Sequence, residues 1–241
     1  MPDAQPVVAD RLDVDAAVRR ARSEADWHAF LPARAAGPAW RLGHLVKRGI
    51  DLAVSAVGLV ALLPVFVSLA VLIRVTSSGP VFYRWRVLGR RARPFVGYKF
   101  RTMVVDADAR KSALLGHNEM RGPVFKMRSD PRVTRVGRVL RKTSLDELPQ
   151  LWSVLIGEMS LVGPRPVSAE EFARFDPWQW GKLAVVPGIT CLWQVNGRSH
   201  IADFDEWARL DLEYIHKWNL WLDLKILLRT VPTVVRGDGA Y

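Results

Sequence analysis

The stretch LAVSAVGLVALLPVFVSLAVLI, residues 52–73, has 22 consecutive residues without a charged side chain. Lys47 and Arg48 precede it, and Arg74 follows it. A straight helix of this length would measure about 33 Å, against roughly 30 Å for the hydrocarbon core of a bilayer. The stretch is therefore long enough to enter a membrane. It begins too far along the chain, and is too long, for the apolar part of a cleaved signal peptide.

Pro64 divides this stretch into 12 residues before it and 9 after it. An interior proline removes a backbone hydrogen bond and clashes with the preceding turn, so we expect the helix to break there. Arms of about 18 and 14 Å would each cross one leaflet, and the cationic flanks suit two ends that return to the same anionic surface. The pattern favours a re-entrant helix-break-helix. A spanning helix that tolerates its proline and a buried core helix are the alternatives.

The composition of the chain, 241 residues with 49% hydrophobic and 24% charged, supports one domain with a core. It excludes a disordered chain and a transporter with many spanning helices. The single cysteine excludes a disulfide framework and a cysteine-rich metal site. The net charge of +11 is concentrated in residues 41–145, which carry 21 basic and 5 acidic side chains. Such a region must face nucleic acid, a phospholipid surface or a phosphorylated substrate.

Outside the apolar stretch, the sequence predicts a mainly α-helical fold with a small β-hairpin. A short helix is expected near 13–30, in an N-terminal segment that is either a solvated arm or a docking segment for a partner. Residues 81–87 and 95–100 are rich in β-branched and aromatic side chains and predict the hairpin, whose arginines suit lipid headgroups: Arg84, Arg86, Arg90, Arg91 and Arg93. The amphipathic segments 148–156 and 218–235 suit helices in the membrane interface, where tryptophan is favoured. Ordinary core packing explains each tryptophan equally well.

The densest chemistry lies in RKTSLDELPQLWSVLIGEMSLVGPRP, residues 141–166. Ser144 to Glu147 fits a capping box, but Pro149 would then be the fifth helical residue, where an amide hydrogen is needed. With Asp146 as N-cap, Pro149 is the third residue, where none is needed. We therefore expect Asp146 at a helix N-terminus, where free amides and the helix dipole hold a phosphate and keep the carboxylate ionised. Adjacent carboxylates facing a phosphate also need a cation, which points to Mg²⁺ held by Asp146 and Glu147.

Eight motifs occur in a fixed order along the chain. They are KR..D at 47–51, GPVFY at 79–83, YKFRTM at 98–103, SDPRVTRVG at 129–137, LRKTSLDELPQLW at 140–152, GEMSLVGPRP at 157–166, PGIT..WQVNGR at 187–198 and DLKIL at 223–227. This series resembles the bacterial sugar transferase family, the monotopic phosphoglycosyl transferases. The resemblance runs from about residue 44 to the C-terminus, and the ordered set is far more specific than any single motif.

The resemblance implies a reaction at the cytoplasmic face of the bacterial inner membrane. A UDP-sugar gives its sugar-1-phosphate to undecaprenyl phosphate and UMP is released, which begins the assembly of exopolysaccharide, capsule or O-antigen type glycans. Asp146 matches the nucleophile that forms a covalent phosphosugar intermediate, and Glu147 matches a residue associated with Mg²⁺ and the diphosphate. The other matches concern phosphate or nucleotide-sugar binding: Lys99, Arg141, Arg165, Asn196 and Arg198. For each lone basic residue, a solvated or headgroup-facing charge is the alternative.

General chemistry agrees with this implication. Phosphoryl transfer asks a protein chiefly for in-line positioning and charge neutralisation, which a carboxylate nucleophile among cations can provide. A lipid phosphate cannot leave the bilayer, so its site must lie at headgroup depth, where a re-entrant anchor would hold it. The expected organisation is a polar N-terminal arm at 1–43, a re-entrant membrane helix at 44–76, and a cytoplasmic catalytic domain lying on the membrane at 77–241.

The expected partners are a UDP-sugar, undecaprenyl phosphate and anionic phospholipid, without nucleic acid, and a homodimer is left open. The long central motifs and the GAY ending at 239–241 favour UDP-glucose or UDP-galactose. A membrane-anchored nucleic-acid binder or a non-enzymatic scaffold would leave Asp146, Glu147 and the GPRP motif without a purpose. Cys191 departs from the family pattern, in which glycine commonly follows PGIT, so a positive φ at this position would strain the loop.

Overall fold

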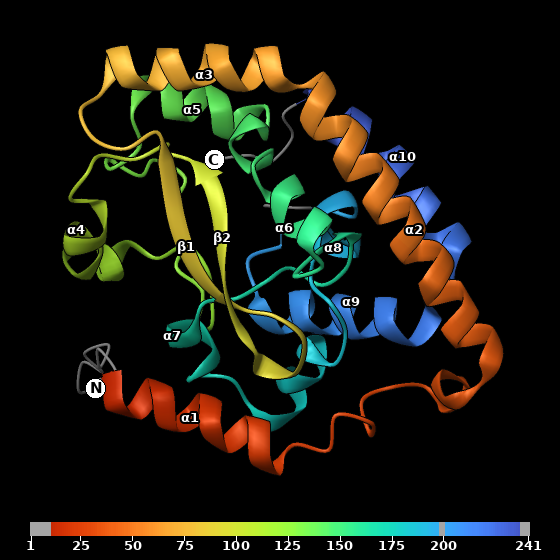
Figure 1. Ribbon diagram of the computed structural model, residues 1–241. Coiled ribbons are helices and arrows are strands. Elements are labelled where there is room, and N and C mark those ends of the chain that lie inside the picture. Colours follow the sequence, from red (N-terminus) through yellow and green to blue (C-terminus); the bar gives the residue numbers. More distant parts are fainter. Residues whose placement is uncertain (1–10, 198–200, 237–241) are drawn as a thin grey trace.

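The computed structural model describes residues 11–197 and 201–236 as a mainly helical protein with two small sheets (Figure 1). The helices are α1 (Arg11–Glu24), α2 (Pro38–Ala61), α3 (Leu63–Thr76), α4 (Ala107–Leu114), α5 (Arg135–Lys142), α6 (Gln150–Ile156), α7 (Ala169–Phe172), α8 (Leu192–Val195), α9 (Phe204–Lys217) and α10 (Leu220–Arg236). The strands are β1 (Phe82–Leu88), β2 (Pro94–Phe100), β3 (Ser160–Val162) and β4 (Gly188–Thr190). The predicted helical class and the β1–β2 hairpin are confirmed. The parallel pair β3–β4 was not predicted.

The apolar stretch forms a bent helix pair. No single described helix has the length and hydropathy of a membrane span, whereas α2 and α3 meet that test together and are bent by 59°. The break lies at Leu62, whose amide donates to the Gly58 carbonyl at 2.9 Å. Pro64 is the second residue of α3, where no amide hydrogen is needed. The predicted break is therefore present, two residues before the proline.

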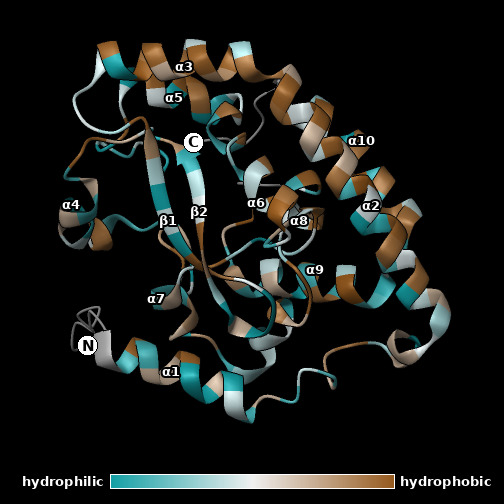
Figure 2. Cartoon of the chain, in the orientation of Figure 1, coloured by the Kyte–Doolittle hydropathy of each residue, from teal (hydrophilic) through white to brown (hydrophobic). Residues whose placement is uncertain are grey.

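Hydrophobic residues follow one another along α2 and α3 (Figure 2), and most of their side chains are exposed. Val57, Val60 and Leu63, around the bend, are 68, 76 and 60% exposed. The buried residues of the two helices are Asp51, Ser55, Leu69 and Ile73. A core helix would bury its apolar side chains instead, so the buried-helix alternative is wrong. An uncovered apolar surface of this kind marks a contact with a membrane or a partner.

The side chains of the KR..D motif connect α2 to α10, α6 and β3 through hydrogen bonds. The Lys47 Nζ donates to an Asp223 carboxylate oxygen of α10 at 2.6 Å. Arg48 donates to two carbonyls near the end of α6 at 2.5 and 2.8 Å, and Asp51 accepts the backbone amide of Leu161 in β3 at 3.0 Å. Because three elements are bound from a single helical turn, the apolar pair is held in a fixed orientation relative to them.

Lys47→Met is expected to destabilise this junction. Asp223 would remain buried and, within the described part of the chain, would keep the hydrogen bonds from Tyr214 and Trp218, at 2.7 and 3.2 Å. Breaking a buried charge pair on one side costs about 2–5 kcal/mol. Thermal or denaturant unfolding in detergent measures the loss, and Arg20→Met, which removes a pair that is more than half exposed, is the control with about 1 kcal/mol or less. Equal losses for the two variants would contradict this role of Lys47.

The hairpin stands between α3 and the N-terminal segment. Its strands pair from Phe82 with Phe100 to Leu88 with Pro94, and the start of β1 lies near the end of α3 (Figure 1). The tip, residues 90–92, lies at the opposite end against α1, where Arg91 Nη2 is 3.3 Å from His28 Nε2. The arginines of the tip are therefore far from the apolar helix pair. Their predicted contact with headgroups stays a prediction.

Helix α1 is present where a short helix was expected, but the idea of a solvated arm is wrong. Val18 and Ala21 of α1, with Trp27 beyond it, are buried in a core cluster that also contains residues of α7 and α9. The apolar spacing of α1 gives it one face to bury. Helix α2 begins at Pro38, so the expected boundary between residues 43 and 44 falls inside it.

A small apolar cluster joins α3 to the hairpin and to α5. It contains Leu69 and Ile73 of α3, Phe100 of β2 and Leu140 of α5, all buried. Lys99 precedes Phe100 and Arg141 follows Leu140. The cluster thereby brings two of the predicted phosphate-binding residues toward the same space.

Candidate active site

Asp146 and Glu147 lie in a 3₁₀ turn, Leu145–Glu147, just before α6. The predicted register is wrong, because α6 begins at Gln150 and its N-cap is Pro149, not Asp146. Ser144 has left-handed backbone angles, φ 53° and ψ 17°. Its carbonyl accepts the Glu147 amide at 3.2 Å, which tightens the turn. Pro149 still occupies a position that needs no amide hydrogen, but the helix begins three residues later than expected.

The Glu147 carboxylate is bound by two cations rather than by the helix start. Lys99 Nζ and Arg165 Nη2 each donate to Glu147 Oε1 at 2.9 Å. Burial opposes ionisation of Glu147, but the charges of Arg165 and Lys99 outweigh it and hold the pKa of this carboxyl well below its usual range. The Lys99 Nζ also lies 4.3 Å from the centre of the Trp85 ring. Glu147 is therefore a permanent anion that positions two cations.

Asp146 has the opposite electrostatic environment. It is 9% exposed, and burial, together with the neighbouring charge of Glu147, raises its pKa to about 6. Lys99, Arg141 and Arg165 act in the other direction but do not cancel the effect. Two adjacent carboxyls whose pKa values are pushed apart are typical of sites where they have different roles. At neutral pH the Asp146 carboxylate is mostly ionised and is poorly solvated.

This pKa predicts a pH-dependent gain of stability in Asp146→Asn. A raised carboxyl pKa favours folding below the unfolded value near 4, and this contribution is lost as the pH rises through about 6. In metal-free buffer, the melting temperature of the variant relative to wild type should therefore rise between pH 4 and 6 and then level off. A difference in melting temperature that does not change with pH would contradict the raised pKa.

Arg141 enters the site from the end of α5. Its Nε donates to the Thr102 hydroxyl at 3.0 Å. Helix α5 lies so close to the backbone of Thr102 that an added Cβ on Gly137 would come within 2.0 Å of the Thr102 carbonyl oxygen. Thr134 caps the helix by accepting the Gly137 amide. The SDPRVTRVG motif therefore positions Arg141, which explains why its glycine is needed.

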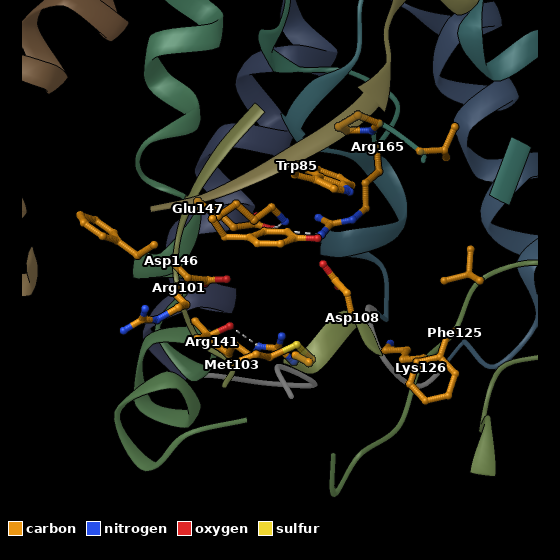
Figure 3. A pocket seen from close by; sticks show the side chains of 18 of the residues that line it. Trp85, Arg101, Met103, Asp108, Phe125, Lys126, Arg141, Asp146, Glu147 and Arg165 are labelled. Carbon is orange, nitrogen blue, oxygen red and sulfur yellow. Dashed lines mark hydrogen bonds and ion pairs between the residues drawn. The ribbon is translucent and has the colours of Figure 1, made fainter. Parts of the chain in front are cut away.

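A cavity of about 610 Å³ contains these side chains (Figure 3). Figure 3 shows Arg165 beneath Trp85, with Arg141 on the opposite side and Asp108 facing the same space. Five of the predicted residues line this cavity together: Lys99, Arg141, Asp146, Glu147 and Arg165. The arrangement offers a carboxylate among cations, which suits a reaction at a phosphate.

The cavity also has a pair of stacked tryptophans in its lining, which was not predicted. Trp193 and Trp207 stack with ring centres 3.9 Å apart and planes 6° apart, and both line the cavity. Their indole Nε1 atoms are buried without a hydrogen-bond partner among the described residues. A buried donor without a partner calls for water or a ligand. The position of Trp193 in the WQVNGR motif was the only sequence signal for this pair.

The remaining predicted residues lie elsewhere. Asn196 follows α8, outside the lining of this cavity, and its Oδ1 is 3.4 Å from Arg229 Nη1. Arg198 lies outside the described residues. Cys191 is buried, with φ −146° and ψ 169°. This extended backbone suits any residue, so cysteine at that position causes no strain.

The dyad has the donors that Mg²⁺ uses. No group of three or more potential protein ligands occurs among the described residues, but Mg²⁺ is commonly held by one or two carboxylates together with substrate phosphates and water. Both ion pairs of Glu147 use the same oxygen, Oε1. The other carboxylate oxygen and Asp146 therefore fit a magnesium ion that is shared with a diphosphate.

Most of the chain is similar to known sugar transferases. Residues 42–237 match the family model for bacterial sugar transferases. The chain is 45% identical over 202 residues to galactosyl transferase CpsE of Streptococcus agalactiae, and 41% identical over 206 residues to undecaprenyl-phosphate galactose phosphotransferase of Salmonella typhimurium. Each match covers 83% of this chain but only 45 and 43% of the relative. Exopolysaccharide production protein ExoY of Sinorhizobium fredii is 38% identical over 218 residues, which cover 88% of this chain and 96% of that protein.

Proposed function

The chain belongs to the bacterial sugar transferase family, and from this premise we propose that it transfers a sugar-1-phosphate from a UDP-sugar to undecaprenyl phosphate, releasing UMP. The observation that supports this most strongly is the buried dyad of Asp146 and Glu147 among Lys99, Arg141 and Arg165, in one cavity. The product would begin the assembly of an exopolysaccharide or capsule.

In the proposed reaction, an oxygen of Asp146 attacks the phosphorus that carries the sugar. A bond from Asp146 to phosphorus forms while the bond from phosphorus to the bridging oxygen breaks, and UMP leaves with the bonding electrons. An oxygen of the lipid phosphate then attacks the same phosphorus and releases the Asp146 carboxylate. A pKa of about 6 supports this role, since the group is mostly ionised at neutral pH without being strongly solvated.

Cations would neutralise the charge that moves between the phosphates. Arg165 and Lys99 are held in place by Glu147, and Arg141 by Thr102, so their charges need little reorganisation during the reaction. A magnesium ion held by Glu147 and Asp146 would supply further charge neutralisation at the diphosphate.

The sugar nucleotide would extend toward Trp193 and Trp207. Their buried indole donors fit the carbonyl or hydroxyl acceptors of such a ligand. Two of the relatives are named for galactose, which favours UDP-galactose, with UDP-glucose as the alternative. Residues 239–241, which also pointed to a hexose, lie outside the described residues.

Trp193→Phe is expected to raise the KM for the UDP-sugar several-fold while leaving the KM for the lipid acceptor unchanged. The phenyl ring keeps an aromatic face but loses the N–H donor, and a hydrogen bond is worth about 1 kcal/mol. Steady-state kinetics with each substrate varied in turn measures both constants. A change in both KM values, or in neither, would show that the indole pair serves only the core.

The apolar helix pair would be a re-entrant anchor in the bacterial inner membrane, with the rest of the chain on the cytoplasmic face. The support is the 59° bend, the uncovered apolar side chains and the flanking cations. Exposed apolar residues on α6 and α10, Trp152, Trp221 and Leu228 among them, would place these helices in the interface. Of the expected division, we keep the anchor within 44–76 and the catalytic domain at 77–241. The segment before them is not a free arm, because α1 packs into the core and α2 begins at Pro38.

Topology can be tested with single cysteines, because the native Cys191 is buried. Ser23→Cys on α1 places an exposed thiol before the anchor in the sequence, and Lys217→Cys on α9 places one after it. Both should resist an impermeant thiol reagent in intact cells and react after permeabilisation. Labelling of Ser23→Cys alone in intact cells would establish a spanning helix.

The catalytic proposal is tested by UMP release. The purified chain with Mg²⁺, undecaprenyl phosphate and a panel of UDP-sugars should release UMP over many turnovers with one hexose or a few. Without the lipid, release should stop at about one UMP per active site. A chain that releases no UMP with any UDP-sugar would contradict the proposed function and favour a scaffold.

A further inference from the structure

The mouth of the cavity has an apolar rim. Phe82, Tyr83 and Val105 line the cavity, yet they are 42, 41 and 64% exposed. Phosphate groups bind polar and cationic partners, so apolar side chains at the entrance do not serve them. Exposed apolar groups beside a polar cavity mark a ligand or surface with an apolar part.

This rim is continuous with the apolar helix α3. Phe82 stacks on Phe100, with ring centres 5.3 Å apart, and Phe100 meets Phe66 of α3 at 5.4 Å. On the other side, an added Cβ on Gly79, in the turn that follows α3, would come within 2.7 Å of Val105 and 2.2 Å of the Arg101 guanidinium. The rim is therefore joined to α3 by apolar packing through the buried Phe100, and Val105 lies beside the turn that follows α3.

The same cavity carries positive charge. Lys99 and Arg141 line it together with the three rim residues. Toward α3 the surface stays apolar, with Val71 and Val75 exposed by 57 and 73%. A ligand that matches this surface has an anionic head and a long apolar chain.

We propose that the rim of Phe82, Tyr83 and Val105 carries the isoprenoid chain of the lipid phosphate acceptor out of the cavity and onto α3. The phosphate head lies among the cations of the cavity, the first isoprene units lie inside it, and the units that follow cross the rim. This inference rests on the proposed function, because it concerns the acceptor of that same reaction. It assigns to the rim the selection of a long polyprenyl chain over a short one.

The test compares Val105→Asn with Val139→Asn. Both valines are largely exposed, at 64 and 61%, but Val139 lies on α5 outside the cavity lining. The three proteins are assayed in the same detergent for UMP release without acceptor, and for the KM of undecaprenyl phosphate and of the short geranyl phosphate. The reaction without acceptor reports folding and donor binding, independently of the lipid.

Val105→Asn should raise the KM for undecaprenyl phosphate about fivefold to tenfold, as expected for the loss of one buried apolar contact. Its KM for geranyl phosphate should change less, and its UMP release without acceptor should match wild type. Val139→Asn should resemble wild type in all three assays.

Equal KM values of Val105→Asn and wild type for undecaprenyl phosphate would overturn the proposal. Equal increases of this KM in both asparagine variants would also overturn it, because the rim would then serve general membrane attachment. A Val105→Asn variant that loses UMP release without acceptor would also overturn it, in favour of a role in folding or donor binding. Failure of the wild-type chain to release UMP at all would instead refute the proposed function.

Discussion

Asp146→Asn is expected to abolish turnover, with a loss of about 10⁴-fold or more, as for other enzymes that lose a nucleophile. A carboxamide cannot form the acyl phosphate, so UMP release in the absence of lipid should disappear as well. The variant should nevertheless fold, because the buried carboxylate that it removes is unfavourable at neutral pH. Rapid-quench measurement of UMP after mixing with UDP-sugar and Mg²⁺ gives the burst directly.

Glu147→Gln is the matched comparison, with the same change of carboxylate to amide one residue later. It should slow the burst and weaken its dependence on Mg²⁺ without abolishing it, since Glu147 holds Lys99 and Arg165 rather than the reacting bond. Appreciable activity in Asp146→Asn, together with complete loss in Glu147→Gln, would reverse the two assignments.

Arg165→Ala is expected to lower kcat about 10²- to 10³-fold, the range for removing one preorganised charge donor from a transition state. The guanidinium both binds Glu147 and faces the cavity (Figure 3). Its removal withdraws charge from the phosphate and leaves Lys99 as the only ion-pair partner that the structure gives Glu147 among the described residues. Arg165→Lys should recover part of the loss, because lysine restores the positive charge but lacks the parallel N–H donors with which a guanidinium binds a phosphate.

Arg138→Ala serves as the control for Arg165→Ala. Arg138 is an exposed residue of α5 that does not line the cavity. A headgroup contact of a basic side chain is worth about 1 kcal/mol, so this change should have a small effect on turnover at saturating lipid. Similar small losses in Arg138→Ala and Arg165→Ala would show that both cations serve membrane attachment only.

Sequence reasoning worked where the determinants are local. The uncharged run and Pro64 predicted a broken apolar helix, because hydropathy and a missing amide act within a few residues. The hairpin followed from two β-rich segments on either side of a turn. The Asp146 and Glu147 pair was identified by its motif, and the structure places both in one cavity with Lys99, Arg141 and Arg165.

The features that were missed depend on distant contacts or on unusual backbone. The register before α6 could not be predicted, because Ser144 has left-handed backbone angles, which are rare in residues other than glycine and asparagine. Lys47 and Asp223 meet across 176 positions of sequence. The strands of the β3–β4 pair have only three residues each, too few for a periodic signal. Tryptophan content alone could not distinguish the stacked Trp193–Trp207 pair in the cavity from ordinary core residues.

The most direct test of the central claim is the mass of the protein after reaction with the donor alone. The chain is mixed with Mg²⁺ and UDP-galactose or UDP-glucose without lipid, quenched in acid and analysed by intact-mass and peptide mass spectrometry. We expect a mass increase of one hexose phosphate, located on the peptide that contains Asp146 and lost when undecaprenyl phosphate is added before the quench. UMP release that occurs only when donor and lipid are both present, with no such adduct, would contradict covalent catalysis by Asp146.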